Sequence, residues 1–67
     1  MTITKTDAKN LESCDIIRFY GISGAPTDAE TAAQAPEVCV AKSSAGDTYD
    51  LAYDDNTAEF ILTKKES

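Results

Sequence analysis

One stretch of the chain concentrates side chains that could do chemistry: GDTYDLAYDDNTAE, residues 46–59. It has no basic residue, and it holds five carboxylates: Asp47, Asp50, Asp54, Asp55 and Glu59. A carboxylate cluster can bind a metal ion, exchange protons with a substrate, or present negative charge to a basic partner. The spacing of the carboxylates and the residues around them distinguish these three chemistries.

The spacing does not fit a calcium-binding loop. An EF-hand loop needs oxygen ligands at positions 1, 3 and 5, glycine at position 6 and glutamate at position 12. A loop that begins at Asp47 has tyrosine at position 3 and alanine at position 12. A loop that begins at Asp50 has Asp55 where glycine is needed. The turn at residues 54–56 is better explained as a polar hairpin tip than as a looser metal site.

Catalysis and cofactor binding are not expected either. Asp50 and Asp54 on one face of a strand would lie roughly 13 Å apart at about 3.3 Å per residue, whereas the carboxyl groups of an inverting glycosidase are about 6.5–9.5 Å apart. The chain has no histidine that could activate a serine or a thiol. Cys14 and Cys39 lack zinc-ligand spacing, and no glycine-rich phosphate loop is present. We therefore expect no enzymatic activity, no metal and no cofactor.

The charge restricts the kind of partner. The formal net charge is −6, and residues 24–62 carry eight acids against Lys42 alone. Nucleic acids and anionic membranes are themselves negative, so direct binding to either is not expected. The sequence has neither a long apolar run nor a signal-peptide pattern. We therefore expect a cytoplasmic protein with free thiols at Cys14 and Cys39, folded as one small domain over residues 1–67.

Local patterns predict the α+β class, with one or two short helices on one face of a three- or four-stranded, mainly antiparallel sheet. Thr6 or Asp7 can cap the first helix, and Thr27 with Glu30 forms a capping box for the second. The run IIRFY favours a strand, and a single longer helix ending at Gly21 is the alternative. The predicted elements are, in order, a helix over 7–14, a strand over 15–22, a helix from 28 to 34 or 35, and strands over 37–42, 47–54 and 57–64.

Two hairpin turns set the predicted register of the last three strands. A two-residue turn at 55–56 places Leu51 opposite Phe60. A turn over SSAG, residues 43–46, places Val38 opposite Leu51. Both turns predict one buried face, which packs against the helices and consists of Val38, Val40, Tyr49, Leu51, Tyr53, Phe60 and Leu62. The opposite face then carries Glu37, Cys39, Asp50, Ala52, Asp54, Glu59 and Ile61.

The acidic side chains of this sheet form the predicted partner-binding surface. Same-face residues of a strand lie about 6.6 Å apart and neighbouring strands about 4.8 Å apart, so carboxylates on a sheet approximate the spacing of a phosphate array. A solvated face that serves only solubility is the alternative. The predicted partner-binding residues are Glu37, Asp47, Asp50, Asp54, Asp55 and Glu59.

In its small size and its acidic runs DTYDLAYDDNTAE and TDAETAAQAPE, the chain resembles phage-encoded inhibitors of the anti-CRISPR group. The resemblance implies a basic partner, a Cas effector subunit, whose nucleic-acid-binding groove the chain occupies as a nucleic-acid mimic or a steric block. That group shares no common fold or signature, so no residue role is carried over. We expect a monomer or a weak dimer. The alternatives are a phage or bacterial assembly adaptor, held by apolar contacts at Ile61 and Cys39, and an acidic antitoxin.

Overall fold

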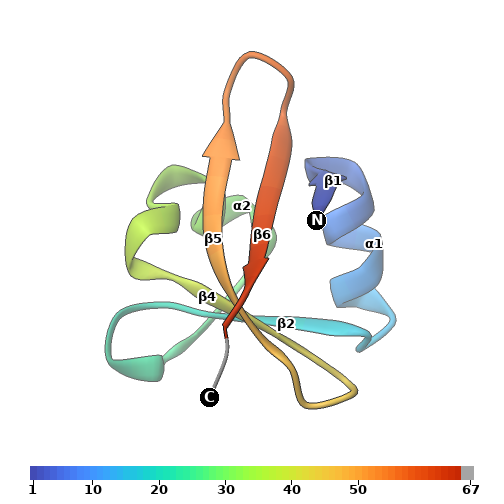
Figure 1. Ribbon diagram of the computed structural model, residues 1–67, viewed down its shortest axis with the longest axis vertical. Helices are drawn as coiled ribbons and strands as arrows, with labels where there is room; N and C mark the ends of the chain where they lie inside the picture. Colours follow the sequence, from blue (N-terminus) through green and yellow to red (C-terminus); the bar gives the residue numbers. More distant parts are fainter. Residues whose placement is uncertain (66–67) are drawn as a thin grey trace.

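A six-stranded antiparallel sheet is the frame of the fold within residues 1–65, the residues that the computed structural model describes (Figure 1). The strands lie in the order β1-β6-β5-β4-β2-β3. Their bounds are β1 (Thr2–Thr4), β2 (Ile17–Tyr20), β3 (Pro26–Thr27), β4 (Val40–Ser43), β5 (Thr48–Asp54) and β6 (Glu59–Lys64). The predicted α+β class is confirmed, with more strands than the three or four expected.

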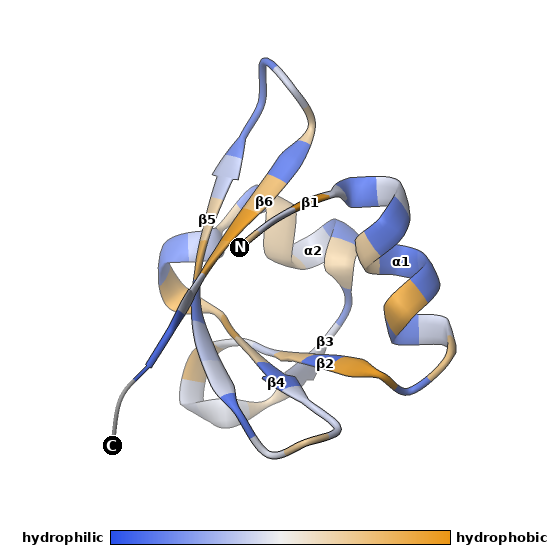
Figure 2. Cartoon of the chain, turned by 45° about the vertical axis from the view of Figure 1, so that its right-hand side comes forward, coloured by the Kyte–Doolittle hydropathy of each residue, from blue (hydrophilic) through white to orange (hydrophobic). Residues whose placement is uncertain are grey.

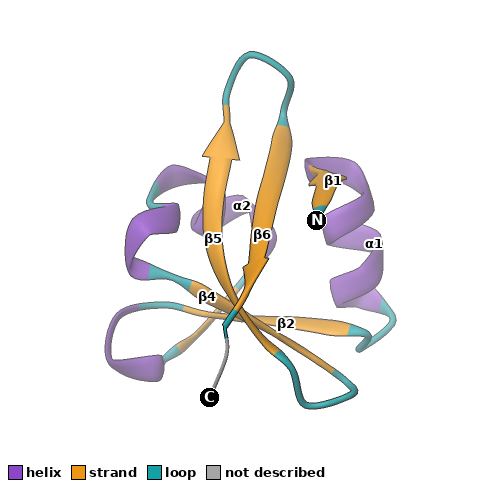
Figure 3. Cartoon of the chain, viewed as in Figure 1, coloured by secondary structure: helices purple, strands orange, loops and turns teal. Residues whose placement is uncertain are grey.

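Two helices, α1 (Lys5–Ser13) and α2 (Ala29–Gln34), pack on one face of the sheet, and Figure 3 shows them beside and behind the strands. Two short 3₁₀ segments lie in the connections: η1 (Ile22–Gly24) between β2 and β3, and η2 (Pro36–Val38) between α2 and β4. The predicted arrangement of short helices on one side of a mainly antiparallel sheet is therefore present.

The ends of α1 are set by two local features. The side chain of Thr4 accepts a hydrogen bond from the backbone N–H of Asp7 at 3.1 Å, so Thr4, and not Thr6 or Asp7, caps the helix. After the C-terminal cap at Cys14, Asp15 takes a left-handed φ of 58°, a conformation that aspartate tolerates better than most residues. The chain therefore leaves the helix and enters β2, and the alternative of one longer helix is wrong.

The start of α2 is set by Asp28. Its carboxylate accepts a hydrogen bond from the backbone N–H of Thr31 at 2.7 Å, and this bond is the main reason that the pKa of Asp28 is lowered. A lowered pKa means that the cap stabilises the fold above the pKa of the unfolded chain and is lost as the pH falls through the folded-state pKa. Thr27 belongs to β3, where it pairs with Phe19 of β2, and it lies one residue before the N-terminal cap, Asp28. The predicted capping box of Thr27 and Glu30 is therefore wrong.

The core lies between the helices and the sheet. Phe19, Phe60 and Leu62 are the largest fully buried side chains, and the ring centroids of the two phenylalanines lie 5.6 Å apart. Figure 2 shows hydrophobic segments along β2 and β6 and hydrophilic residues on α1 and at the β5–β6 turn. Small side chains let the helices approach the sheet closely, and the helical residues that are fully buried are all alanines: Ala8, Ala29 and Ala32.

The β5–β6 hairpin keeps the predicted faces although its turn is longer than predicted. Residues 55–58 form the turn, so Leu51 pairs with Leu62 and Tyr53 with Phe60, and the predicted pair of Leu51 with Phe60 is wrong. A shift of two positions leaves each side chain on its predicted side, because the period of a strand is two. The five residues predicted to face the core from these strands do so: Tyr49, Leu51, Tyr53, Phe60 and Leu62.

The loop of the β4–β5 hairpin has three residues, whereas a turn of four residues, 43–46, was predicted. The backbone N–H of Ser43 donates to the carbonyl of Asp47 at 2.9 Å, so only residues 44–46 form the loop. Gly46 ends it with a φ of 93°, as glycine does in three-residue hairpin loops that contain a bulge. Ala41 is consequently the partner of Tyr49, whereas a four-residue turn would place Val40 opposite Tyr49 and Val38 opposite Leu51.

This one-residue difference turns every side chain of β4 to the other face. Cys39 and Ala41 are buried, whereas Val38 is 45% exposed and Val40 is half-buried. The predicted burial of the two valines and the predicted exposure of Cys39 are therefore wrong. In addition, the chain forms η2 where the strand was predicted to begin at Glu37.

Two strands at the edges of the sheet were not predicted. β1 pairs with β6 through Ile3 and Phe60, and β3 pairs with β2. β2 also pairs with β4, over a shorter range than the predicted strand 15–22. β6, the last strand in the chain, therefore lies inside the sheet between β1 and β5.

Candidate functional site

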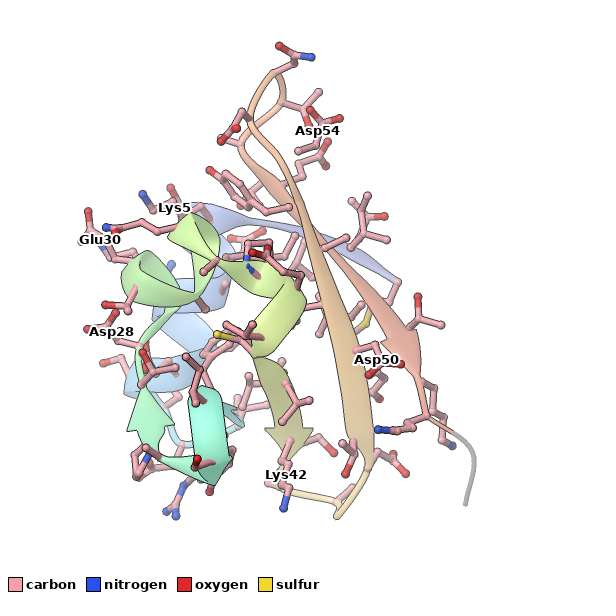
Figure 4. The ribbon with its side chains drawn as sticks, turned by 90° about the vertical axis from the view of Figure 1, so that its left-hand side faces the viewer. Lys5, Asp28, Glu30, Lys42, Asp50 and Asp54 are labelled. Carbon is pink, nitrogen blue, oxygen red and sulfur yellow. The ribbon has the colours of Figure 1, made fainter. Side chains whose placement is uncertain are left out.

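The outer face of the sheet, which points away from α1 and α2, carries no buried side chain within the described residues. Strand pairing assigns to it Arg18, Tyr20, Val40, Lys42, Thr48, Asp50, Ala52, Asp54, Glu59, Ile61 and Thr63. Figure 4 shows Asp54 and Lys42 near opposite ends of the molecule, with Asp50 between them. The outer face therefore runs from an acidic end to a basic end.

The acidic hairpin end, which we define as Asp54, Asp55 and Glu59, occupies the β5–β6 turn and the strand ends beside it. Asp54 and Glu59 are cross-strand partners on the outer face, so their Cβ atoms lie about 4.5–5.5 Å apart. No ion pair within residues 1–65 involves either of them. Two carboxylates directly opposite each other repel and destabilise a sheet. The carboxylate of Asp54 also accepts a hydrogen bond from the backbone N–H of Asn56 at 2.9 Å, which helps to hold the turn.

Asp55 and Glu37 lie apart from that pair. Asp55 lines a hollow of about 420 Å³ beside the helices, together with Lys5, Glu30 and Tyr53. Glu37 is exposed on η2. Burial is the main cause of the raised pKa of the Cys39 thiol, and the charge of Glu37 raises it further.

Asp47 and Asp50, at the other end of β5, are partly neutralised. The antiparallel course of β6 returns the end of the chain to the start of β5, which places Lys64 Nζ 3.5 Å from Asp47 and Lys65 Nζ 4.0 Å from Asp50. These pairs are exposed, and such pairs contribute about 0–1 kcal/mol each. The six predicted partner-binding residues therefore do not form one surface. Among them, those without an ion pair within residues 1–65 are the acidic hairpin end and the separate Glu37.

Glu30, from the second acidic run, is also paired. Its carboxylate lies 3.7 Å from Lys5 Nζ and 3.5 Å from Lys9 Nζ. Asp28 caps α2, and Glu12 accepts a hydrogen bond from the backbone N–H of Ala29 at the start of the same helix. Glu12, Asp28 and Glu30 on the helical side of the molecule therefore have structural partners.

The basic end of the outer face was not found from the sequence. Arg18 of β2 and Lys42 of β4 are cross-strand partners, and Lys42 Nζ lies 5.3 Å from the centroid of the Tyr20 ring. The two residues are far apart in the chain, and only the pairing of β2 with β4 brings them together. The alternation within IRFY, which places Arg18 and Tyr20 on one face of a strand, is the signal that could have indicated it.

The described residues contain no group of three His, Cys, Asp or Glu side chains that could hold a metal ion. Cys14 is an exposed and Cys39 a buried free cysteine, so the predicted free thiols are confirmed. Within residues 1–65, no helix has the length and apolarity needed to cross a membrane.

No protein-family model, no curated protein and no solved structure matches this chain. The fold and the candidate site define the class as a small α+β domain. The outer face of its sheet is not covered by the helices, and it has an acidic end and a basic end.

Replacing Ala58 with glycine is expected to stabilise the protein by about 0.5–1 kcal/mol. Ala58 ends the β5–β6 turn with a left-handed φ of 54°, a conformation that costs residues with a Cβ about 1–2 kcal/mol and costs glycine nothing. Its carbonyl, which accepts a hydrogen bond from the backbone N–H of Lys5 at 2.8 Å, is retained in the variant. Urea unfolding followed by circular dichroism measures the change.

The matched control is Ala52→Gly, in the extended interior of β5. Glycine should cost about 0.5–1 kcal/mol there, because it gains nothing from its freedom and loses more entropy on folding. Equal losses of stability in the two glycine variants would contradict the expected relief of strain at Ala58.

Proposed function

We propose that the chain is a non-enzymatic binding protein whose acidic hairpin end docks in a basic groove of a partner protein. The observation that carries this proposal is the Asp54–Glu59 pair, in which two carboxylates face each other with no cation of residues 1–65 paired to either. The arrangement costs stability in the free protein, and cations of a partner would make it favourable.

The shape of the hairpin supports a groove as the partner surface. Figure 1 shows the β5–β6 hairpin extending beyond both helices, so the acidic hairpin end is accessible from several sides. The hairpin is two strands wide, with about 5 Å between the strands. The Cβ atoms of its two paired acidic residues lie about 4.5–5.5 Å apart, and a nucleic acid strand carries one phosphate charge per about 3.4 Å of its axis. A groove that accommodates a nucleic acid strand therefore suits it in both width and charge.

The narrower candidate is inhibition of a CRISPR-Cas effector in the cytoplasm of a bacterial host. It rests on the resemblance in size and acidity to phage-encoded anti-CRISPR proteins. In this role the acidic hairpin end would compete with target DNA for a basic groove of the effector, without itself binding nucleic acid. A Cas effector is consequently the first partner to test.

A second candidate is an assembly adaptor that binds by apolar contact at the centre of the outer face. Ile61 is 41% exposed, and its cross-strand partner Ala52 is exposed as well. Cys39, which was expected to contribute, is buried. Salt distinguishes the two candidates, because binding through the acidic hairpin end weakens steeply as salt is added and apolar docking does not.

Neutralising the acidic hairpin end is expected to weaken partner binding about tenfold or more, because the partner desolvates these charges. The variant is Asp54→Asn with Glu59→Gln, in which the introduced asparagine keeps an oxygen that can accept the turn hydrogen bond. The control is Asp7→Asn with Glu30→Gln, which removes the same charge by the same two types of substitution from exposed positions on the helices. The measurement is competition with target DNA in mobility-shift titrations of purified CRISPR-Cas effectors, at low and high salt.

A pull-down from bacterial lysate at both salt concentrations extends the test to partners outside that panel, and each identified partner is titrated with the same two variants. Equal weakening by the two variants would mean that net charge alone drives binding and would contradict a role for the hairpin. Binding that resists both salt and neutralisation but is lost in Ile61→Lys would favour the adaptor.

A further inference from the structure

The basic end of the outer face is built around two cations in register. Arg18 and Lys42 are directly opposite each other on β2 and β4, and like charges in that position destabilise a sheet. They line a hollow of about 400 Å³, together with Tyr20, Ser43 and Ser44. Lys42 has no carboxylate within 4.0 Å among residues 1–65, whereas the other five basic residues each have one.

The groups around the hollow are held in place by the fold. The Tyr20 ring is half-buried, and Lys42 Nζ lies 5.3 Å from its centroid, a cation–π contact that orients the lysine. The Ser43 hydroxyl accepts a hydrogen bond from the backbone N–H of Asp47 at 3.2 Å, which helps to fix the loop beside the hollow. The backbone N–H of Ser44 donates to the carbonyl of Ile16 at 2.9 Å, which ties the loop to the start of β2.

We propose that this hollow binds a phosphoryl group carried as a monoester. A phosphate monoester has a charge near −2 at neutral pH and three strong acceptor oxygens, so one group neutralises both cations and accepts hydrogen bonds from both. A carboxylate neutralises only one of the two cations. The hollow is larger than a phosphoryl group, which leaves room for the part of the ligand that carries it.

The ligand is a discrete monoester and not a nucleic acid. A phosphodiester carries one charge per phosphate, and its neighbouring phosphates would lie against a protein of net charge −6. This site is separate from the acidic hairpin end and does not depend on the proposed function. Neutralising Asp54 and Glu59 should leave phosphate binding unchanged, so the failure of either proposal does not affect the other.

Asp15 competes with the ligand. Its carboxylate lies 3.8 Å from an Arg18 guanidinium nitrogen and lines the same hollow. Both side chains of this pair are mostly exposed, so the pair is weak and easily exchanged. Removing the Asp15 charge should therefore strengthen phosphate binding. Asparagine suits the left-handed backbone at this position as well as aspartate does.

The test is a two-dimensional ¹⁵N–¹H NMR titration at constant ionic strength, with chloride as the reference anion. The probes are inorganic phosphate, glucose 6-phosphate, a neutral peptide with one phosphoserine, and a short DNA duplex. Inorganic phosphate should shift the amides of Arg18, Lys42 and Ser44 with a saturating curve. If glucose 6-phosphate binds more tightly than the phosphoserine peptide, the natural ligand is a small metabolite; the reverse order indicates a phosphorylated protein.

Four variants complete the test. Arg18→Gln and Lys42→Gln should each weaken phosphate binding about fivefold or more, and Asp15→Asn should strengthen it about twofold or more. Lys9→Gln removes an exposed lysine of α1 and should change nothing. The proposal is overturned if phosphate shifts no amide at the hollow, if Lys9→Gln weakens binding as much as Lys42→Gln, or if the DNA duplex binds as tightly as the monoesters.

Discussion

Replacing Phe60 with alanine is expected to remove most of the stability of the protein. Phe60 is fully buried, and its ring centroid lies 4.9 Å from that of Tyr53 and 5.6 Å from that of Phe19. Truncating such a ring costs about 3–5 kcal/mol. A domain of this length has a free energy of unfolding of about 3–10 kcal/mol. The loss is therefore comparable to the whole, and Phe60→Ala should be partly unfolded even without denaturant.

The adjacent residue provides the control. Ile61 is 41% exposed on the outer face, so Ile61→Ala should cost about 1 kcal/mol or less. Urea unfolding followed by circular dichroism compares the two variants with the parent protein. A loss at Ile61 as large as the loss at Phe60 would show that the two faces of β6 are assigned the wrong way round.

Replacing Ala41 with glutamine is the second change with a large expected effect. Ala41 is fully buried at the centre of the sheet, opposite Tyr49. Glutamine there both overpacks the core and buries an amide without a partner, two effects that each cost about 1–3 kcal/mol. The free energy of unfolding should therefore fall by about 3–5 kcal/mol.

The same substitution at Val40 tests the register of β4. Val40 is half-buried on the outer face, where the amide of glutamine reaches water, so Val40→Gln should cost about 1 kcal/mol. Thermal unfolding of the two glutamine variants under identical conditions gives the comparison. In the register predicted from the sequence the order would be reversed, so a larger loss at Val40 than at Ala41 would restore that register.

The faces of β5 and β6 were predictable, although the turn between them is two residues longer than predicted. A change of two residues in a turn leaves every side chain of the strands on the same face, because side chains alternate with a period of two. Leu51 and Phe60 are not the partners that a two-residue turn implies, yet both face the core. The faces of β4 were not predictable in the same way. The serines and the glycine of SSAG all suit a turn, and the choice between a loop of three residues and one of four decides which side Val40 takes.

The acidic hairpin end was predictable from composition, but its isolation from the other acids was not. Asp54 and Glu59 are close in the chain, so a hairpin necessarily brings them together. The neutralisation of Asp47 by Lys64 depends on where β6 ends beside β5. The basic end depends on the pairing of β2 with β4, which are distant in the chain. The alternation within IRFY indicates only that Arg18 and Tyr20 share a face.

The position of β6 inside the sheet has a consequence for how the chain folds during synthesis. β6 supplies Phe60 and Leu62 to the core, and it bridges β1, at the start of the chain, to β5. A nascent chain that ends before residue 59 has no partner for β1, exposes the inner edge of β5 and lacks two of the three largest buried side chains. Unpaired edges of this kind favour aggregation. We therefore expect the sheet and the core to be completed only after residues 59–64 have been translated.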